Sequence, residues 1–382
     1  MDVVALTKEL VKVRSENPPG NQKPIADLLE SKMKEIGLEI RRYDYELNKP
    51  NVVGQLTGKA GKPVLMLNGH MDTVPLGDAS QWRFDPFESV EHDGKLYGRG
   101  TADMKGGLAA MICAAEHLVD DEAELTGSLV VAAVVDEELT GFGTKDLIDR
   151  GYRADFAIVG EPTELMVHTA HKGALEFDVF TRGKAAHASK PRSGVNAIYK
   201  MSEVCLALEK HLDELEKIIH PLVGSATISI GTIEGGSARN VVAEECKIQV
   251  ERRVIPGEDL DQVKDDLKQV FEKLKANDPK LELDWRVTLE VDAAETPPAS
   301  PIAGIATEAV SQITGRIVKP TGFEATCDMR FLVNRAGIPT VVLGPGSLDQ
   351  AHVADEHVPV KELRDATEIY RLISKRLLGT RD

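Results

Sequence analysis

Residues 64–72 read VLMLNGHMD, an apolar run that ends in a histidine and an aspartate two positions apart. Two further runs are apolar on every residue and contain β-branched residues, Leu129–Val135 and Phe156–Val159. Such runs are typical of strands buried on both faces, which belong to mostly parallel sheets covered by helices. Between them, Lys105–Leu118 (KGGLAAMICAAEHL) predicts a small-residue helix that can pack closely on a sheet. We therefore expect an α/β domain whose mixed, mostly parallel sheet carries helices on both faces.

The pattern changes near Gly173. Ala174–Thr181 alternates apolar and polar residues, as a half-exposed strand does. A helix, two strands, a helix and a strand follow, and the order β-α-β-β-α-β predicts a ferredoxin-like α+β unit. The expected bounds of these five elements are Val195–Ile218, Ala226–Ile233, Lys247–Val254, Leu260–Leu274 and Leu283–Val291.

The first pattern resumes after the inserted unit. Thr296–Pro301 (TPPASP) predicts a return linker, Pro339–Gly344 another buried strand, and Val360–Leu378 a closing helix. Near the N-terminus, residues 4–38 look helical with a break at Asn17–Gly20. We therefore expect one domain made of residues 1–172 and 293–382, with a second domain, residues 173–292, inserted into it.

The amino-acid composition limits the kinds of molecule that the protein can bind. Of the 382 residues, 42% are hydrophobic and 28% charged, as in ordinary soluble globular proteins. Forty-six Lys and Arg against 62 Asp and Glu give a net charge of -16, whereas nucleic acids and anionic membranes need a basic surface. The N-terminal residues lack a signal-peptide pattern, and the four scattered cysteines form no C-x-x-C pair. We expect a cytoplasmic protein with no nucleic-acid or membrane partner.

Polar residues follow four of the expected strands, and a further acidic residue precedes a helix. In open α/β sheets, ligands bind beyond the carboxyl ends of the strands, so the residues after the strands should meet at one rim. Asp103 lies in a turn that contains two glycines, GRGTAD at 98–103, directly before the expected helix. The residues that follow the strands are His70, Asp72, Glu137, Glu138, Glu161 and His352.

Each of these residues alone has an ordinary explanation. A histidine after a strand is usually a loop residue, and adjacent glutamates are usually a solvated face. A glycine-rich turn before a helix can bind phosphate, although Asp103 would repel one. Together, however, several carboxylates at one edge cannot all stay ionised without a counter-charge. A pair of divalent cations supplies it, and histidine and carboxylate ligands without cysteine suit zinc, with cobalt or manganese as substitutes.

Such a site has a definite chemistry. Two ions about 3.5–4 Å apart can activate water and polarise a carbonyl together. A carboxylate outside the metal shell must then take the proton of the water and pass it to the leaving nitrogen. Successive side chains of an extended segment point to opposite sides, so one of Glu137 and Glu138 can bind metal while the other faces the substrate.

At these residues the chain resembles the M20 family of metallopeptidases and amidohydrolases, which includes acetylornithine deacetylases, succinyl-diaminopimelate desuccinylases, aminoacylases and glutamate carboxypeptidases. The resemblance covers nearly the whole chain. It is carried by GHMDTVP at 69–75, GRGTADMKGG at 98–107, DEELTGFGT at 136–144, GEPT at 160–163 and GPGSLDQAH at 344–352. It implies a zinc-exopeptidase-like catalytic domain with two zinc ions, and an inserted domain that serves as a lid and as a homodimer contact.

The resemblance also implies individual roles. Glu137 would be the general base and acid, and Asp72 would orient His70 through its ring nitrogen. The bond after Asp103 is often cis in this family. The metal ligands would be His70, Asp103 (bridging both ions), Glu138, Glu161 and His352.

Four residues outside the metal shell match family positions as well. His187 resembles the histidine that reaches across a dimer to stabilise the oxyanion. Arg330 resembles an arginine that binds a substrate carboxylate, and Asn240 and Arg252 resemble substrate-contacting positions. Without the resemblance, His187 would be an ordinary surface residue and each arginine could equally form a surface ion pair.

The motifs indicate two different branches of the family. GPGSLDQAH followed by ADEH at 354–357 resembles acetylornithine deacetylases, whereas Arg330 after Asp328 resembles the desuccinylases. The resemblance implies hydrolysis of the amide bond of an N-acyl amino acid, which releases a carboxylic acid and a free amino acid. The alternative is a dipeptidase or glutamate-carboxypeptidase-like metallopeptidase. A non-catalytic relative should lack some ligands or Glu137, and none is missing.

Overall fold

The computed structural model describes residues 1–121 and 125–379 and divides the chain into two compact units. The first unit comprises residues 1–169, 295–323 and 327–382, and the second comprises residues 170–294 and 324–326. Each has its own hydrophobic core. The second unit contains all the residues that the sequence predicts as an inserted domain.

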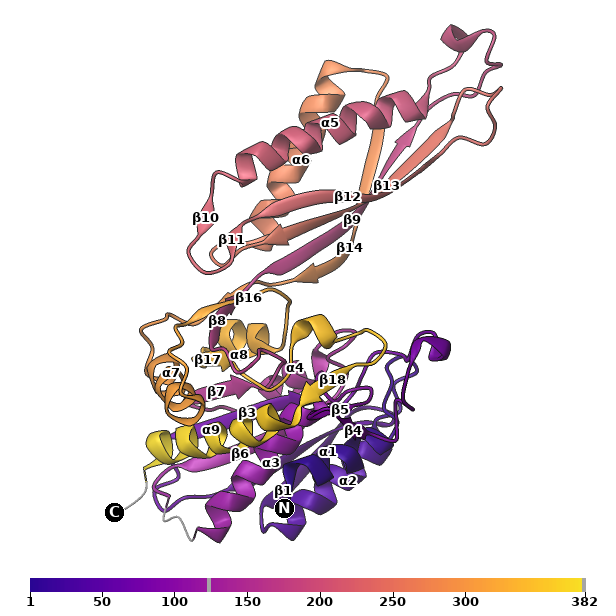
Figure 1. Cartoon of the computed structure of the whole chain (residues 1–382). Coiled ribbons are helices and arrows are strands. Elements are labelled where there is room, and N and C mark those ends of the chain that lie inside the picture. Colours follow the sequence, from indigo (N-terminus) through magenta and orange to yellow (C-terminus); the bar gives the residue numbers. More distant parts are fainter. Residues whose placement is uncertain (122–124, 380–382) are drawn as a thin grey trace. The chain divides into compact units, whose positions relative to one another are not determined.

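A nine-stranded sheet forms the centre of the first unit (Figure 1). Its strands run in the order β1-β2-β6-β3-β7-β17-β8-β15, with β16 paired to β8. The pairs β6–β3, β3–β7 and β7–β17 are parallel, whereas β1–β2, β2–β6 and β17–β8 are antiparallel. The bounds are β1 Glu39–Glu46, β2 Lys49–Leu56, β3 Val64–His70, β6 Ser128–Val134, β7 Phe156–Val159, β8 His168–His171, β15 Ala294–Glu295, β16 Thr321–Phe323 and β17 Thr340–Val342.

Helices cover both faces of this sheet. α1, α3, α7 and α9 pack against one another on one face, and α4 and α8 pack together on the other (Figure 1). The mixed α/β architecture predicted from the sequence is therefore confirmed. The helices are α1 Val3–Lys12, α2 Lys23–Glu35, α3 Lys105–Asp120, α4 Phe142–Asp149, α7 Pro301–Thr314, α8 Met329–Ala336 and α9 Val360–Leu378.

Two features of local sequence bring α3 close to the rim of the sheet. Every residue of β6 is buried, as its continuous apolar run predicts. The second and third residues of α3 are glycines, and a Cβ at Gly107 would lie 2.4 Å from the main-chain oxygen of Gly160. The absence of a side chain there lets the first turn of α3, and with it the Asp103 turn, pack directly on the segment that carries Glu161.

Shorter elements complete the first unit. β4 (Val90–His92), β5 (Lys95–Tyr97) and β18 (His357–Pro359) form a three-stranded antiparallel sheet. Two short 3-10 helices, η1 (Ala79–Gln81) and η3 (Leu348–Gln350), lie in the loops. Among the described residues, no helix is both long and apolar enough to span a bilayer.

The second unit is a four-stranded antiparallel sheet of order β12-β13-β9-β14, with α5 and α6 packed on it. The sequence order β9-α5-β12-β13-α6-β14 is the predicted β-α-β-β-α-β arrangement, with the 3-10 helix η2 between β9 and α5 and the small hairpin of β10 and β11 between α5 and β12. The bounds are β9 Gly173–Arg182, η2 Pro191–Ser193, α5 Ala197–Leu215, β10 Ile219–His220, β11 Gly224–Ser225, β12 Thr227–Gly235, β13 Glu245–Val254, α6 Leu260–Asn277 and β14 Glu282–Val291.

Candidate metal centre

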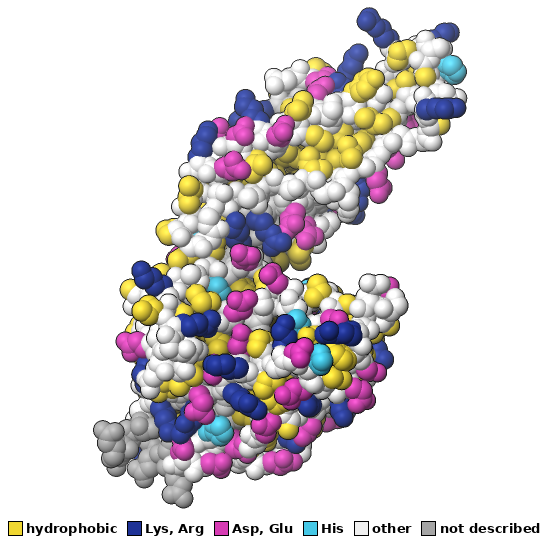
Figure 2. Space-filling view, viewed as in Figure 1, with side chains coloured by type: hydrophobic (Ala, Val, Ile, Leu, Met, Phe, Trp, Pro, Cys, Tyr) yellow, Lys and Arg dark blue, Asp and Glu magenta, His cyan; other side chains and the backbone are white. Residues whose placement is uncertain are grey.

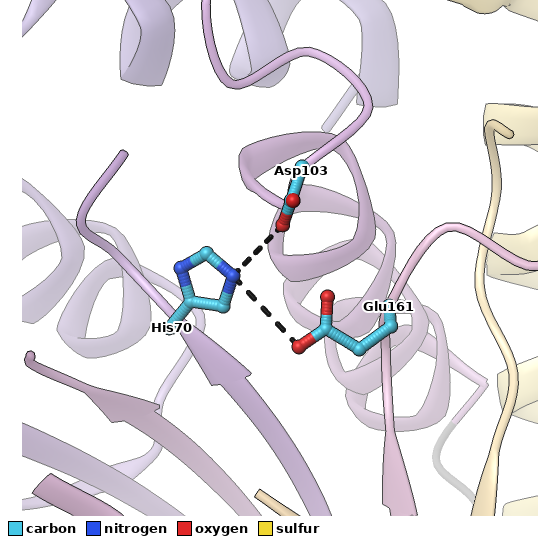
Figure 3. Close-up of side chains that lie close together, drawn as sticks. All are labelled: His70, Asp103 and Glu161. Atoms are coloured by element: carbon cyan, nitrogen blue, oxygen red, sulfur yellow. Dashed lines mark hydrogen bonds and ion pairs between the residues drawn. The ribbon is translucent and has the colours of Figure 1, made fainter. Parts of the chain in front are cut away.

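Three side chains from distant parts of the first unit converge beyond the end of β3 (Figure 3). His70 is the last residue of β3, Asp103 lies in the turn before α3, and Glu161 follows β7. The Nε2 atom of His70 lies 2.9 Å from Oδ1 of Asp103 and 3.8 Å from Oε1 of Glu161. All three are buried, so their ligand atoms face one another rather than solvent.

A second group shares Asp103. The other carboxylate oxygen of Asp103, Oδ2, lies 3.2 Å from Nε2 of His352, which in turn lies 3.1 Å from Oε2 of Glu138. The main-chain N–H of Val74 donates to Oε1 of Glu138 at 3.0 Å and fixes that side chain. In each group the ligand atoms lie within 4.8 Å of one another, and Asp103 belongs to both. The structure thus gathers the five residues predicted as metal ligands into two groups that share Asp103.

The carboxylates of these groups perturb one another strongly. Burial, followed by the charge of Asp103, raises the pKa of Glu161 to about 7. Burial would also raise the pKa of Asp103, but hydrogen bonds from His352 and His70 outweigh it and lower that pKa. The same contacts with Asp103 and Glu138 raise the pKa of His352 to about 10. Such a cluster of buried acids and imidazoles needs an added positive charge to be stable when deprotonated.

The donor set fits a pair of divalent metal ions. Each group offers one imidazole nitrogen and carboxylate oxygens from two residues, without a thiolate. Zinc takes such ligands readily, and cobalt and manganese accept them as well. The bond between Asp103 and Met104 is cis, as expected from the resemblance.

Asp72 makes contacts different from those expected. The Nδ1 atom of His70 lies 2.9 Å from the main-chain oxygen of Asp72 but 3.7 Å from its carboxylate oxygen Oδ1. The carboxylate is instead an acceptor for the main-chain N–H groups of Glu137, at 3.2 Å, and Glu138, at 3.3 Å. The main chain therefore orients the imidazole, and the carboxylate of Asp72 holds the backbone of the Glu137–Glu138 pair.

Glu137 is the carboxylate of the pair that lies outside both ligand groups. Burial, and after it the charge of Glu161, raises the pKa of Glu137 well above its usual value. A carboxylate whose pKa is raised toward neutrality can both accept and return a proton, which is what general acid–base catalysis requires.

Three residues of this network, Asn17, Lys49 and Asp136, were not among the predicted site residues. The side-chain N–H₂ of Asn17 donates to Asp72 at 3.0 Å and to Asp136 at 2.8 Å, and Lys49 donates to Asp136 at 2.7 Å. Asp136 has a left-handed backbone, with φ 63°, directly before the glutamate pair. The sequence signal that could have indicated Asn17 is its place before Pro18 and Pro19, in a break between two helices.

Arg330 lies in the first unit at the start of α8, and its side chain is buried. Its guanidinium donates to the main-chain oxygens of Cys327, at 3.0 Å, and Thr140, at 3.1 Å. Thr140 lies two residues after Glu138, so these bonds tie α8 to the segment of the glutamate pair. Contact with a substrate carboxylate stays a prediction.

The remaining predicted residues lie in the second unit. His187 and Asn240 are exposed and belong to adjacent segments, because the N–H of Ala188 donates to the main-chain oxygen of Asn240 at 3.0 Å. Arg252 is different: its side chain is 2% exposed and forms an ion pair with Glu258. Contact of Arg252 with a substrate stays a prediction.

Comparisons with known proteins agree with this geometry. The model of the family described as peptidase family M20/M25/M40 matches residues 66–376. An acetylornithine deacetylase of Vibrio atlanticus is 34% identical over 353 residues, 88% of this chain and 86% of that protein. A probable succinyl-diaminopimelate desuccinylase of Staphylococcus epidermidis is 29% identical over 408 residues, 99% of this chain and 98% of that protein. The crystal structure of the aminopeptidase PepT from Bacillus cereus superimposes with a TM-score of 0.83 at 25% identity, covering 98% of both chains.

Proposed function

Because this chain belongs to peptidase family M20/M25/M40, whose members are hydrolases, we propose that it cleaves the amide bond of an N-acyl amino acid. The reaction is of the EC 3.5.1 type, in which water adds to the acyl carbon, the C–N bond breaks, and a carboxylic acid and a free amino acid leave. The N-acyl group is of the acetyl or succinyl kind, which the names of the two relatives suggest.

The observation that carries this proposal is the sharing of Asp103 between two ligand groups beside an uncoordinated Glu137. Two divalent ions held by these ligands would polarise the scissile carbonyl and acidify a water molecule. Zinc is the ion we propose, with cobalt or manganese as substitutes.

The side chains of this chain supply the proton transfers. Glu137, whose pKa is raised by burial and by Glu161, takes a proton from the attacking water and returns it to the leaving nitrogen. Asp72 places Glu137 through a hydrogen bond to its main-chain N–H. By the resemblance, His187 acts across the homodimer and stabilises the negative charge that develops on the carbonyl oxygen. By the same resemblance, Arg330 contacts the amino-acid part of the substrate.

A dipeptidase or glutamate-carboxypeptidase-like activity is the second candidate. It is favoured by the TM-score of 0.83 with the aminopeptidase PepT, which means that a peptide-cleaving enzyme shares this architecture. The two activities differ in the group on the acyl side of the scissile bond, which is a simple acid in one case and a second amino acid in the other.

A substrate panel separates the two candidates. N-acetyl and N-succinyl derivatives of ornithine, diaminopimelate and glutamate are compared with a set of dipeptides, each with zinc, cobalt or manganese added to chelator-treated protein. We expect the highest kcat/KM with an N-acetyl or N-succinyl amino acid. Preference for a dipeptide contradicts the acyl-amino-acid proposal, and equal turnover with and without chelator contradicts the metal-dependent mechanism.

We also propose that the protein is a cytoplasmic homodimer, associated through the second unit. Figure 2 shows a band of hydrophobic side chains over α5 and β12. Exposed large hydrophobic residues of these elements are Ile198, Tyr199 and Leu206 on α5 and Ile233 on β12. An exposed apolar patch of this kind is typical of an interface. Light scattering should give twice the chain mass of 41.6 kDa, and Leu206→Glu should reduce it to one chain. A wild-type protein that is monomeric at micromolar concentration contradicts the dimer.

A further inference from the structure

The carboxylate of Glu356 contacts the turn that carries the shared ligand. Its Oε1 atom is an acceptor for the main-chain N–H of Ala102, at 3.0 Å, and for that of Asp103, at 3.1 Å. Its Oε2 atom accepts from the guanidinium of Arg99 at 2.6 Å. One side chain therefore binds both the backbone of the ligand turn and a residue within that turn.

Glu356 also belongs to the loop of another ligand. His352 precedes it by four residues, and the main-chain oxygen of Glu356 is an acceptor for the N–H of Gly98 at 2.9 Å. The side chain of His352 is 54% exposed, so packing alone does little to hold it. The contacts of Glu356 fix the end of the His352 loop to the start of the Asp103 turn.

The charge pair that holds Glu356 lies in the protein interior. The side chains of Glu356 and Arg99 are 1% and 2% exposed, and the ring of Trp82 lies 5.1 Å from the guanidinium. A buried ion pair contributes little net stability, because the desolvation of both groups offsets their attraction. Its geometric consequence is definite: Arg99 holds one oxygen of Glu356, which leaves the other aimed at two adjacent N–H groups of the ligand turn.

We propose that Glu356 is a positioning residue of the metal centre. It orients the Asp103 turn so that the two oxygens of Asp103 face His70 and His352, and it ties the His352 loop to that turn. This inference rests on the proposed metal-dependent function. Residues that orient metal ligands typically contribute about 10–100-fold to metal affinity, although they do not touch the metal.

Two conservative substitutions separate the position of the carboxylate from its charge. Glu356→Asp keeps the charge beside Arg99 but is one methylene shorter, so the carboxylate cannot reach Arg99 and both N–H groups together. Glu356→Gln keeps the reach and one acceptor oxygen for these N–H groups, but it removes the charge and turns an N–H₂ donor toward Arg99. A positioning role predicts that Glu356→Asp loses about 10–100-fold in cobalt affinity, whereas Glu356→Gln loses clearly less.

The control measures general destabilisation. Asp178 is a buried carboxylate of the second unit that pairs with Arg286 at 2.8 Å, so Asp178→Asn removes a comparable charge outside the first unit. The four full-length proteins are freed of metal and titrated with Co²⁺ by calorimetry. The visible absorption spectrum of the bound cobalt reports its coordination geometry, and thermal unfolding of the metal-free proteins reports stability.

The outcomes are distinguishable. An altered cobalt spectrum and weakened binding in Glu356→Asp, with wild-type binding in Asp178→Asn and a clearly smaller loss in Glu356→Gln, support the proposal. Wild-type affinity in Glu356→Asp overturns it, as does an equal loss of affinity in Glu356→Gln, since charge rather than position would then matter. A wild-type protein that binds no cobalt overturns the proposed metal-dependent function and this inference with it.

Discussion

Binding of two divalent ions to the metal-free protein at pH 7 should release about 1.5 protons per chain from His352 and Glu161, and more from His70. The release follows from the protonation of three ligands before the metal binds. Hydrogen bonds with Asp103 and Glu138 raise the pKa of His352 to about 10, so its ring carries a proton at pH 7. Burial alone would lower the pKa of His70, but the charge of Glu161 and the contact with Asp103 raise it well above its usual value, which favours the protonated ring.

Glu161 contributes the remaining fraction. Burial and the charge of Asp103 raise its pKa to about 7, so the carboxyl is about half protonated at pH 7. All three groups must lose their protons to bind metal. Protons therefore compete with the ions, and metal affinity should rise as pH increases from about 6 to 8.

Calorimetry gives the number directly. The protein is titrated with Co²⁺ at pH 7 in several buffers, and the slope of observed enthalpy against buffer ionisation enthalpy is the number of protons released. His352→Gln serves as the control, because it removes one protonated ligand and should lower the release by about one. A wild-type release close to zero would refute the reasoning, since the ligands would then be deprotonated before metal arrives.

Three further predictions test separate parts of the account. Glu137→Gln should lower kcat by about 10²–10⁴-fold while leaving the metal content unchanged, as measured by turnover and elemental analysis; near-full turnover would refute its role. Asn17→Ala removes the donor to Asp72 and Asp136 and should cost about 1–3 kcal/mol in urea unfolding of the metal-free protein, together with a fall in kcat. Phe177→Ala should destabilise the second unit by about 3–5 kcal/mol, because this ring is 1% exposed and contacts Phe271 and Trp285. Cobalt affinity of the first unit should not change in that variant, and a large change would contradict the independence of the two cores.

The buried strands were predictable because their hydrophobic pattern is local. The bounds of β7, Phe156–Val159, and of α9, Val360–Leu378, are those that the sequence predicts. β3 continues three residues beyond the apolar residues Val64–Leu67, because its ladder with β6 extends to the pair His70 and Val134. The sheet of β4, β5 and β18 was not predicted, since its pairing joins His357–Pro359 to Lys95–Tyr97 far along the chain.

Some features of the candidate site could likewise be predicted from the sequence, and others could not. The ligand residues could be named because each follows a strand or a glycine-rich turn. The contacts of Asp72 could not, since a carboxylate that accepts from the main-chain N–H groups of Glu137 and Glu138 leaves no mark on the residue types. The sequence left two roles open for Arg252, a substrate contact or an ion pair, and it does not show that Glu258 is the ion-pair partner.

The most direct test of the central claim is the anomalous scattering of crystals grown with zinc. The account predicts two zinc peaks about 3.5–4 Å apart, one on each side of the Asp103 carboxylate. Cobalt or manganese crystals should show peaks at the same two places. A single peak, or no peak between His70 and His352 at saturating zinc, would contradict it.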